Sequence, residues 1–449
     1  MATEEQRDID PSKPMSLEDA MLLGTRLHRL NLLQEAHGVY TAVLEADPEH
    51  PDALQFLGVL EHQRHHDELA LQYLRRAVSH VPEAPGVHHN LGNILLELRR
   101  FDEAAEAYER CAQLGGNTAE LLNNIGVLRR QQGQFAAAEA AYLQALALNP
   151  EYVDAYNGYG RVLERQKRHE EALQQYSKAL ALAPKHASTR YHAGMALCVL
   201  ERFEEAAQVF RDWLAVDPGN PSAKHYLAAC TGQDVPKRAS DAYVAATFDE
   251  FAQSFDSKLE SLNYRAPELV AATVHNLLGE PDAQLDILDA GCGTGLCGPK
   301  LRPYARHMVG VDLSAKMLEK AKSRGDYHAL HKAELTGFIQ AQSQSFDLIV
   351  SADTLCYFGD LEPVCLAAQR ALRAGGRLIF SVEALAEGDF KLHSLGRYSH
   401  SKDYLSQVLA RSGFSVTLLE EAVLRTEYGS PVHGYVVAAE LTRSSSPER

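Results

Sequence analysis

Residues 119–150 read AELLNNIGVLRRQQGQFAAAEAAYLQALALNP, with apolar residues at helical spacing on both sides of a QGQF turn. The glycine of this stretch belongs to a set that recurs every 34 residues without insertion or deletion: Gly24, Gly58, Gly92, Gly126, Gly160 and Gly194. An alanine follows each glycine by twelve residues, and in five of the six copies a proline follows that alanine by twelve more. A constant period of this size predicts a stacked array of two-helix repeats.

The repeated small residues indicate where the two helices of a unit cross closely. An aromatic residue recurs at one position, and we expect it to fill the space between neighbouring units: Tyr40, Tyr108, Tyr142, Tyr176 and Phe210. This pattern resembles the tetratricopeptide repeat (TPR) family. The resemblance implies an all-α solenoid over residues 17–230, with six repeats, a cap helix at 221–230 and a concave groove.

The groove is the expected binding surface of this array. The resemblance puts the first helix of each repeat on the concave face, and with it amide and guanidinium groups that suit a peptide: Asn90, Asn93, Asn123, Asn124, Asn157, Arg130, Arg161 and Arg165. Any one of them also fits a solvated helix position, but the group favours an extended peptide or protein partner. His62, His65 and His66 share one helix region without a further ligand, so we predict no metal there.

Composition narrows the remaining options. The net charge of −16 over 449 residues argues against a nucleic-acid partner. Seven cysteines without a CxxC pair, a polar start and the lack of a long apolar run favour a cytoplasmic protein without membrane contact. We expect disordered tails at 1–16 and 443–449, a linker at 231–240 and a second domain at 241–442.

The second domain alternates strands with helices, which predicts a parallel α/β sheet with its site at the strand carboxyl ends. Two helices are expected first, over 241–259 and 263–279. The last two strand-like runs, 414–422 and 434–442, have no clear helix between them, which suggests an antiparallel hairpin at the sheet edge.

The chemistry is expected at residues 285–298, LDILDAGCGTGLCG. An apolar strand runs into Asp289, and Gly291, Gly293 and Gly295 then allow the backbone to approach a ligand closely. A second strand ends at Asp312, where a carboxylate can accept both ribose hydroxyls of a nucleoside. Residues 293–298 also satisfy GxGxxG, so the loop alone leaves a dinucleotide site open.

The acid ahead of the glycines, the two preceding helices and the terminal hairpin resemble the class I S-adenosylmethionine-dependent methyltransferases. The resemblance implies a Rossmann-like α/β domain with S-adenosyl-L-methionine as cofactor. Asp289, Gly291, Gly293 and Gly295 would enclose the methionine part, with Asp312 on the ribose, Leu313 on the adenine and Glu334 near the adenine amine. Asp353 and Leu355 would line the methionine or acceptor side. Glu334 stands where aspartate is more usual.

Two departures restrict the acceptor. The fourth strand ends in SADTLCY, unlike the NPPY-type segment of many enzymes that methylate nucleobases or glutamine amides. No acidic set for magnesium is evident, so we predict no metal. Candidates for a general base are His393, Tyr398, His400 and His433, each of which also fits a structural role. Tyr264 and Arg265 are expected to cover the cofactor.

The sequence thus predicts methyl transfer from S-adenosylmethionine to an O or N nucleophile. The repeat groove would recruit a peptide, a protein or a carrier-bound or small-molecule acceptor. Two alternatives remain: a non-catalytic scaffold whose second domain only binds cofactor, and an NAD-dependent oxidoreductase.

Overall fold

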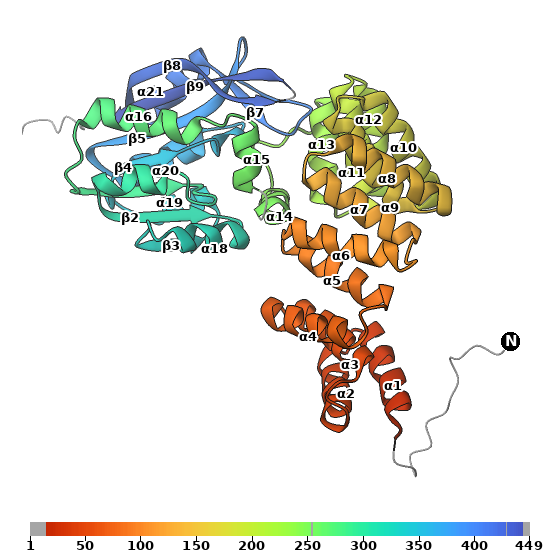
Figure 1. The fold of residues 1–449 in the computed structure, drawn as a ribbon. Coiled ribbons are helices and arrows are strands. Elements are labelled where there is room, and N and C mark those ends of the chain that lie inside the picture. Colours follow the sequence, from red (N-terminus) through yellow and green to blue (C-terminus); the bar gives the residue numbers. More distant parts are fainter. Residues whose placement is uncertain (1–14, 253–254, 428, 443–449) are drawn as a thin grey trace, which may run out of the picture. The chain divides into compact units, whose positions relative to one another are not determined.

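The computed structural model describes residues 15–252, 255–427 and 429–442 (Figure 1). The chain forms two compact units, Met1–Thr189 and Arg190–Arg449, which are described separately. The units divide inside one helix of the last repeat, upstream of the linker predicted at 231–240. The domain bounds drawn from the sequence therefore stay a prediction. The disordered tails predicted at 1–16 and 443–449 lie, apart from Met15 and Ser16, outside the described residues.

The first unit consists of helix pairs, as the 34-residue period predicts. Its helices are α1 (Leu17–Arg29), α2 (Leu33–Ala46), α3 (Pro51–Gln63), α4 (Asp67–His80), α5 (Pro85–Glu97), α6 (Phe101–Gln113), α7 (Ala119–Gln131), α8 (Phe135–Leu148), α9 (Val153–Arg165) and α10 (His169–Leu182). The helix α11 (Ala187–Val199) crosses into the second unit.

The recurring glycine is required by the recurring aromatic residue of the same repeat. A Cβ atom added at Gly126 would lie 2.7 Å from the ring of Tyr142, closer than real Cβ contacts allow. The same holds at Gly24 against Tyr40 and at Gly160 against Tyr176. The ring of Tyr142 also meets Gly158 of the next repeat. The aromatic residue thus packs within its own repeat, and Tyr142 also packs against the next repeat, as expected.

The second unit opens with α12 (Phe203–Val216) and α13 (Pro221–Thr231), the last repeat helix and the cap helix. Three helices precede the sheet: α14 (Asp241–Phe251), α15 (Phe255–Ser261) and α16 (Ala266–Leu278). The single helix predicted over 241–259 was wrong, because two separate helices occupy its described part. The stretch contains no glycine or proline, so the sequence carries no strong turn signal between the two helices.

A nine-stranded sheet forms the rest of this unit. Its path runs β3-β2-β1-β4-β5-β7-β6, and β9 pairs with both β5 and β8. The strands are β1 (Leu285–Ala290), β2 (Ala305–Asp312), β3 (Ala329–Lys332), β4 (Phe346–Ser351), β5 (Leu372–Leu385), β6 (Phe390–Leu392), β7 (Tyr398–Ser401), β8 (Phe414–Glu427) and β9 (Ser430–Leu441).

The pairing of these strands confirms the predicted fold. β1, β2, β3, β4 and β5 pair in parallel, so their carboxyl ends meet at one edge. β8 and β9 form the expected antiparallel hairpin. The short hairpin of β6 and β7 was not predicted, since its residues carry no alternating apolar pattern. The helices between the strands are α17 (Gly298–Leu301), α18 (Ala315–Arg324), α19 (Leu335–Gln340), α20 (Glu362–Ala371) and α21 (Lys402–Arg411).

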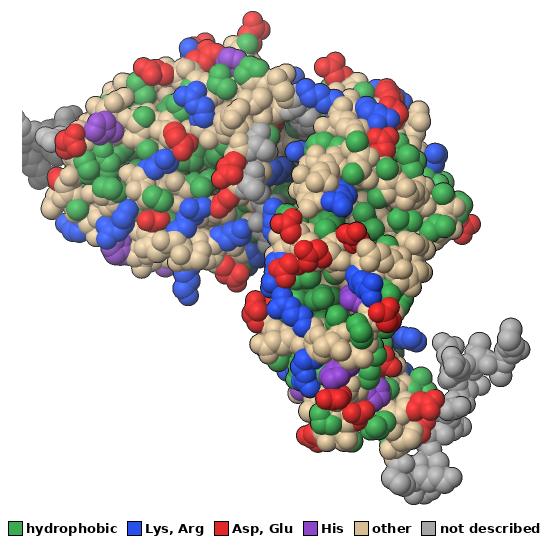
Figure 2. Space-filling model, in the orientation of Figure 1, with side chains coloured by type: hydrophobic (Ala, Val, Ile, Leu, Met, Phe, Trp, Pro, Cys, Tyr) green, Lys and Arg blue, Asp and Glu red, His purple; other side chains and the backbone are tan. Residues whose placement is uncertain are grey.

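Side chains of both charges are interleaved on the face of the molecule seen in Figure 2. No helix within the described residues (15–252, 255–427 and 429–442) is both long and apolar enough to cross a bilayer.

Candidate functional site

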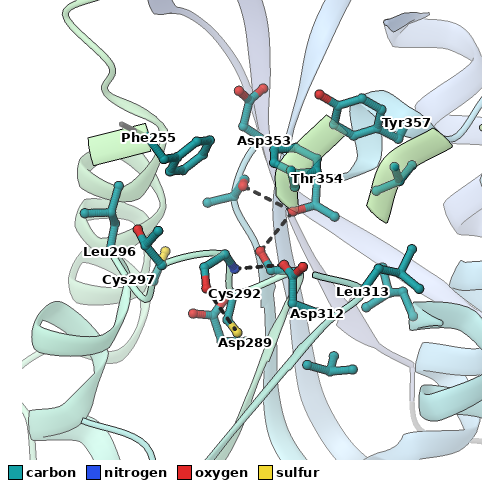
Figure 3. A pocket seen from close by; sticks show the side chains of 18 of the residues that line it. Phe255, Asp289, Cys292, Leu296, Cys297, Asp312, Leu313, Asp353, Thr354 and Tyr357 are labelled. Carbon is teal, nitrogen blue, oxygen red and sulfur yellow. Dashed lines mark hydrogen bonds between the residues drawn. The ribbon is translucent and has the colours of Figure 1, made fainter. Parts of the chain in front are cut away.

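A cavity opens at the carboxyl ends of β1, β2 and β4, and α14 and α15 supply further walls (Figure 3). It encloses about 1040 Å³, part of which is open to solvent. Seven of the nine cofactor residues expected from the sequence line it: Asp289, Gly291, Gly293, Asp312, Leu313, Glu334 and Asp353. The parallel sheet brings these residues together, because they lie at or just after the carboxyl ends of β1, β2, β3 and β4, which meet at the same edge.

The glycine loop after β1 forms the floor of one end. Gly291 has φ +80° and Gly293 has φ +54°, conformations that side chains other than glycine rarely adopt. A Cβ atom at Gly291 would lie 2.3 Å from the side chain of Thr354, which in turn donates a hydrogen bond to the Gly291 carbonyl oxygen (3.1 Å). A side chain at position 291 would therefore clash with Thr354 and strain the backbone. With glycine there, the backbone of the loop stays accessible to a ligand.

Asp289 is buried at the end of β1, with 1% of its surface exposed. The hydroxyl of Tyr327 donates to its carboxylate (2.7 Å). Burial raises the pKa of Asp289 to about 7, and the charge of Asp312 adds to that shift, while the Tyr327 hydrogen bond opposes it. A cationic ligand group beside Asp289 would reverse the shift, because it stabilises the ionised form.

Asp312 ends β2 and is held in place by the backbone. Its two carboxylate oxygens accept hydrogen bonds from the N–H groups of Gly293 (2.9 Å) and Ser314 (2.9 Å). Each oxygen keeps a second lone pair for a further donor. Burial nevertheless raises the pKa of Asp312, against the effect of the backbone donors. The geometry suits a ligand that offers two neighbouring hydroxyl groups.

Glu334 lines the cavity, but its carboxylate caps α19. It accepts hydrogen bonds from the N–H groups of Thr336 (2.9 Å) and Gly337 (2.7 Å). Ala333 and Leu313 line the cavity beside it.

Gly295 and Leu355 are the two expected cofactor residues that do not line the cavity. Gly295 packs closely on Ala321 and Tyr327 behind the loop. Leu355 is buried at the start of the short 3-10 helix η3 (Leu355–Tyr357). Gly295 and Leu355 thus pack behind residues that do line the cavity. The sequence spacing predicted the loops that form the cavity, but not which residue of each loop faces it.

A cluster of charged side chains surrounds the other end, where Asp353 and Tyr357 lie in Figure 3. Arg425 is 1% exposed and pairs with Asp353 (3.2 Å), Glu427 (2.7 Å) and Glu383. Arg397 reaches the same three carboxylates through its Nη1 atom: Asp353 (3.4 Å), Glu383 (3.4 Å) and Glu427 (3.9 Å). Of these five side chains, Asp353 and Arg397 line the cavity.

The backbone at Asp353 is unusual, since a non-glycine residue there has φ +54°. Strained backbone of this kind persists where the surroundings over-determine it, and it is common at functional sites. The N–H of Asp353 donates to Ser381 (2.9 Å) and its carboxylate is held by both arginines. No local sequence pattern points to this cluster, because Arg397, Arg425 and Glu383 come from three separate segments.

The proposed base candidates lie elsewhere. The His400 side chain is fully buried, is hydrogen-bonded to the Gly359 carbonyl oxygen (3.0 Å), and has a pKa lowered by burial to about 4. The Tyr398 hydroxyl donates to the Pro236 carbonyl oxygen (2.6 Å), and His393 contacts the Ser399 hydroxyl (2.6 Å). None of the three lines the cavity, and a catalytic role for them stays a prediction.

Of the other residues predicted from the sequence, some line the cavity and others do not. Tyr264 lines the cavity, but Arg265 does not. His433 is exposed on β9 and pairs with Glu421 (3.3 Å). In the first unit, His62 contacts Asp67 (2.7 Å) and Glu97. Across the described ranges, no group of three metal-ligating side chains is arranged to hold an ion.

The cap helix α13 contacts the turn that carries Arg397. His225 donates from Nε2 to the Gly396 carbonyl oxygen (2.9 Å), and its ring stacks on Tyr243 at 4.1 Å. Gly396 has φ +85°, and a Cβ atom there would lie 2.7 Å from the Tyr243 hydroxyl. The segment after α13 also contacts this region, since the N–H of Ala239 donates to the Tyr357 carbonyl oxygen (2.8 Å). Helix α13 thus belongs to the wall behind the charged cluster.

Comparison with known protein families agrees with this arrangement. A family described as "Methyltransferase domain" matches residues 288–380. Families described as "Tetratricopeptide repeat" match residues 21–88, 123–187 and 173–221, and residues 83–151. The first match covers the part of the cavity formed by β1 to β4 and their loops, and the others cover the helical array.

Three curated proteins show the same similarity. The "Biotin biosynthesis bifunctional protein BioHC" of Saccharophagus degradans is 33% identical over 36% of this chain and 30% of its own length. The "Malonyl-[acyl-carrier protein] O-methyltransferase" of Yersinia pestis is 32% identical over 36% of this chain and 57% of its own. That of Pseudescherichia vulneris is 30% identical over 41% of this chain and 68% of its own. The chain thus spans less than two thirds of the first two relatives.

Proposed function

The chain belongs to the methyltransferase family of the malonyl-[acyl-carrier protein] O-methyltransferases, and we propose that it methylates a carboxylate oxygen of its acceptor. S-adenosylmethionine would be the methyl donor, and the repeat array would recruit the peptide, protein or carrier that presents the acceptor. The observation that supports a carboxylate is the position of Arg397 in the cavity wall, at the end away from the glycine loop.

The residues at the cofactor end fit S-adenosylmethionine. Asp289, a carboxylate whose pKa is raised by burial, would pair with the ammonium group. Asp312 would accept the two ribose hydroxyls, and Leu313 with the Ala333–Glu334 backbone would contact the adenine. When bound, this group supplies a methyl carbon that exchanges its bond to sulfur for a bond to the acceptor oxygen, and the sulfur keeps the electron pair.

Arg397 would hold and orient the acceptor. Its three carboxylate contacts all run through Nη1, so a planar guanidinium anchored by one nitrogen retains donors for an acceptor carboxylate. An ionised carboxylate has no proton to remove, so positioning is the main task of the protein. This agrees with the cavity lining, in which the described residues include no histidine and no lysine.

The charge of the cluster sets an order of binding. Two guanidinium groups and three carboxylates sum to −1. An anionic acceptor is therefore expected to bind well only after the sulfonium charge has entered the cavity. Product-inhibition kinetics would show cofactor binding first.

The test compares two acceptors that differ by one carboxylate: a malonyl-loaded and an acetyl-loaded carrier protein, each with labelled S-adenosylmethionine. We expect label in the malonyl form only. Arg397→Gln should raise the acceptor KM by about 100-fold, since a charge-assisted bidentate contact is lost. Arg377→Gln, at a pair outside the cavity, is the matched control. Equal labelling of both carriers, or an unchanged KM in Arg397→Gln, would contradict the proposal.

A further inference from the structure

We infer that Cys198 on α11 and Cys230 on α13 form a reversible disulfide when the protein meets a hydroperoxide. The two thiols belong to the last repeat and to the helix that follows it, and both lie in the second unit. The bond would tie α13 to the end of α11. This oxidation site does not depend on the acceptor or on the reaction proposed above.

The two sulfur atoms are in contact near the ends of their helices. Sγ of Cys198 lies 3.3 Å from Sγ of Cys230. A disulfide bond is about 2.05 Å long, so the two atoms need to approach each other by about 1.2 Å. Each cysteine is the last residue but one of its helix, since α11 ends at Val199 and α13 ends at Thr231. A helix end adjusts more readily than a helix interior, because its last carbonyl groups lack intrahelical partners.

These two cysteines differ from the other five in the chain. The other five are all buried: Cys111, Cys292, Cys297, Cys356 and Cys365. Within residues 15–252, 255–427 and 429–442, Cys198 and Cys230 are the only two thiols within hydrogen-bond distance of each other. Cys230 is partly exposed, whereas Cys198 has 3% of its surface exposed. An oxidant from solution therefore reaches Cys230 first, and Cys198 lies where it can react with the product.

Ionisation also favours Cys230 as the thiol that reacts first. A hydrogen bond donated by the Cys198 thiol stabilises the Cys230 thiolate and lowers the pKa of Cys230, although burial opposes this effect. The same hydrogen bond, together with burial, raises the pKa of Cys198. The thiolate is the nucleophile, so the more accessible cysteine with the lower pKa is the more reactive of the two.

The oxidation takes two steps. The Cys230 thiolate attacks an oxygen of the hydroperoxide, the O–O bond breaks, and the leaving alkoxide takes a proton from water, so that Cys230 becomes a sulfenic acid. The Cys198 sulfur then attacks the Cys230 sulfur, the S–O bond breaks, and hydroxide leaves as water with the proton of the Cys198 thiol. Two thiols thus give two electrons to one hydroperoxide, and the products are a disulfide, an alcohol and water. A dithiol reverses the bond by exchange.

The bond would stabilise the helix behind the charged cluster. Helix α13 also carries His225, which donates to the Gly396 carbonyl oxygen (2.9 Å) beside Arg397. The disulfide closes a loop of about 30 residues that contains α12, and a loop of this length restricts the unfolded chain. Oxidation is thus expected to stabilise this part of the second unit and to leave the glycine loop unchanged.

The experiment treats the full chain with hydrogen peroxide, blocks the remaining thiols with iodoacetamide and maps the peptides by mass spectrometry. We expect one intramolecular disulfide, between Cys198 and Cys230, that dithiothreitol removes. Cys365→Ala is the control, because it removes a buried thiol on α20 and should form the same bond at about the wild-type rate. Wild-type protein in which Cys230 accumulates as sulfinic acid, or in which Cys230 joins two copies of the chain, would overturn the inference.

Two variants separate the roles of the two thiols. Cys198→Ala leaves Cys230 without a partner, so peroxide should give a stable sulfenic acid that dimedone labels. Cys230→Ala leaves the buried thiol alone, and dimedone labelling of Cys198 should be about tenfold lower. Equal labelling in the two variants would overturn the assignment of Cys230 as the thiol that attacks the peroxide.

Thermal unfolding of the wild type gives a readout that needs no substitution. The oxidised protein should have a Tm about 5 °C above that of the reduced protein, because the bond restricts the unfolded chain. In Cys198→Ala, peroxide should leave the Tm unchanged. S-adenosylhomocysteine affinity should be the same in the oxidised and reduced wild type. A lower Tm after oxidation would show that the bond distorts the helix ends, and would overturn the inference.

Discussion

The two ends of the cavity are built in different ways. The cofactor end consists of a continuous loop, residues 289–295, and the carboxylate of Asp312, which that loop's own backbone holds in place. The acceptor end consists of Asp353, Glu383, Arg397, Arg425 and Glu427, which are far apart in the sequence and meet only in the folded sheet. Local backbone geometry defines the first end, and long-range ion pairing defines the second.

The largest effect is expected at the acceptor end. Arg425→Met would leave Asp353, Glu383 and Glu427 buried beside a single cation. Removing one partner of a buried ion cluster costs about 3–5 kcal/mol of unfolding free energy. Urea unfolding would measure it. Arg377→Met is the control: its pair with Glu440 (3.0 Å) is more exposed and should cost about 1 kcal/mol or less. Similar losses in the two variants would mean that the cluster does not hold this end together.

At the cofactor end, Asp312→Ala should lower S-adenosylhomocysteine affinity by about 100-fold, because hydrogen bonds from two ribose hydroxyls to a charged group are lost. Titration calorimetry would measure the affinity. Asp312→Asn keeps part of the loop contacts and should lose less. Wild-type affinity in Asp312→Ala would remove the ribose assignment.

Seven of the nine residues that the sequence predicted for the cofactor line the cavity, and the reason lies in how this end is built. The positive φ angles of Gly291 and Gly293 require glycine, and the strand that precedes them is apolar, so both features appear in the sequence itself. Arg397 lies close in the sequence to His393, Tyr398 and His400, which are predicted as possible bases, but the sequence does not predict a role for Arg397 itself. Its role depends on ion pairs with residues from β5 and β8, and no local pattern encodes those contacts.

In the repeat half, too, the sequence predicts the local packing but not the long-range ion pairs. The 34-residue period predicted the helix pairs and the close contact at Gly126. The ion pairs of Arg168 with Glu139 (2.9 Å) and Glu171 (2.7 Å) could not be read from the sequence, because several glutamates occur nearby along the chain and only the fold shows which of them pair.

A smaller effect is expected from pH. The pKa of Asp289 is about 7 in the free protein, and an ammonium ligand requires the ionised form. S-adenosylhomocysteine affinity should therefore fall by about tenfold from pH 8 to pH 6. Asp289→Asn should bind more weakly and lose this dependence. The folded state favours the protonated carboxyl, so the stability from this group is greatest below its unfolded pKa and declines as pH rises toward 7. A flat affinity profile in the wild type would contradict the ammonium role.

The smallest effect concerns the repeats. Deletion of residues 1–189 removes one compact unit and should change S-adenosylhomocysteine affinity less than twofold. Deletion of 1–230 also removes α13, with His225 and its contact to Gly396, and should lower the Tm of the remaining protein. Equal Tm values for the two truncated proteins would show that α13 does not support the acceptor end.

The most direct test of a carboxylate acceptor is the chemical lability of the product. Labelled S-adenosylmethionine would be incubated with the purified protein and a lysate of cells that lack it, and the products would then be treated with mild base. A methyl ester releases its label as volatile methanol, and the account predicts this release in the wild type but not in Arg397→Gln. Label that stays bound through base treatment would indicate an N-methyl or ether product and would contradict the account.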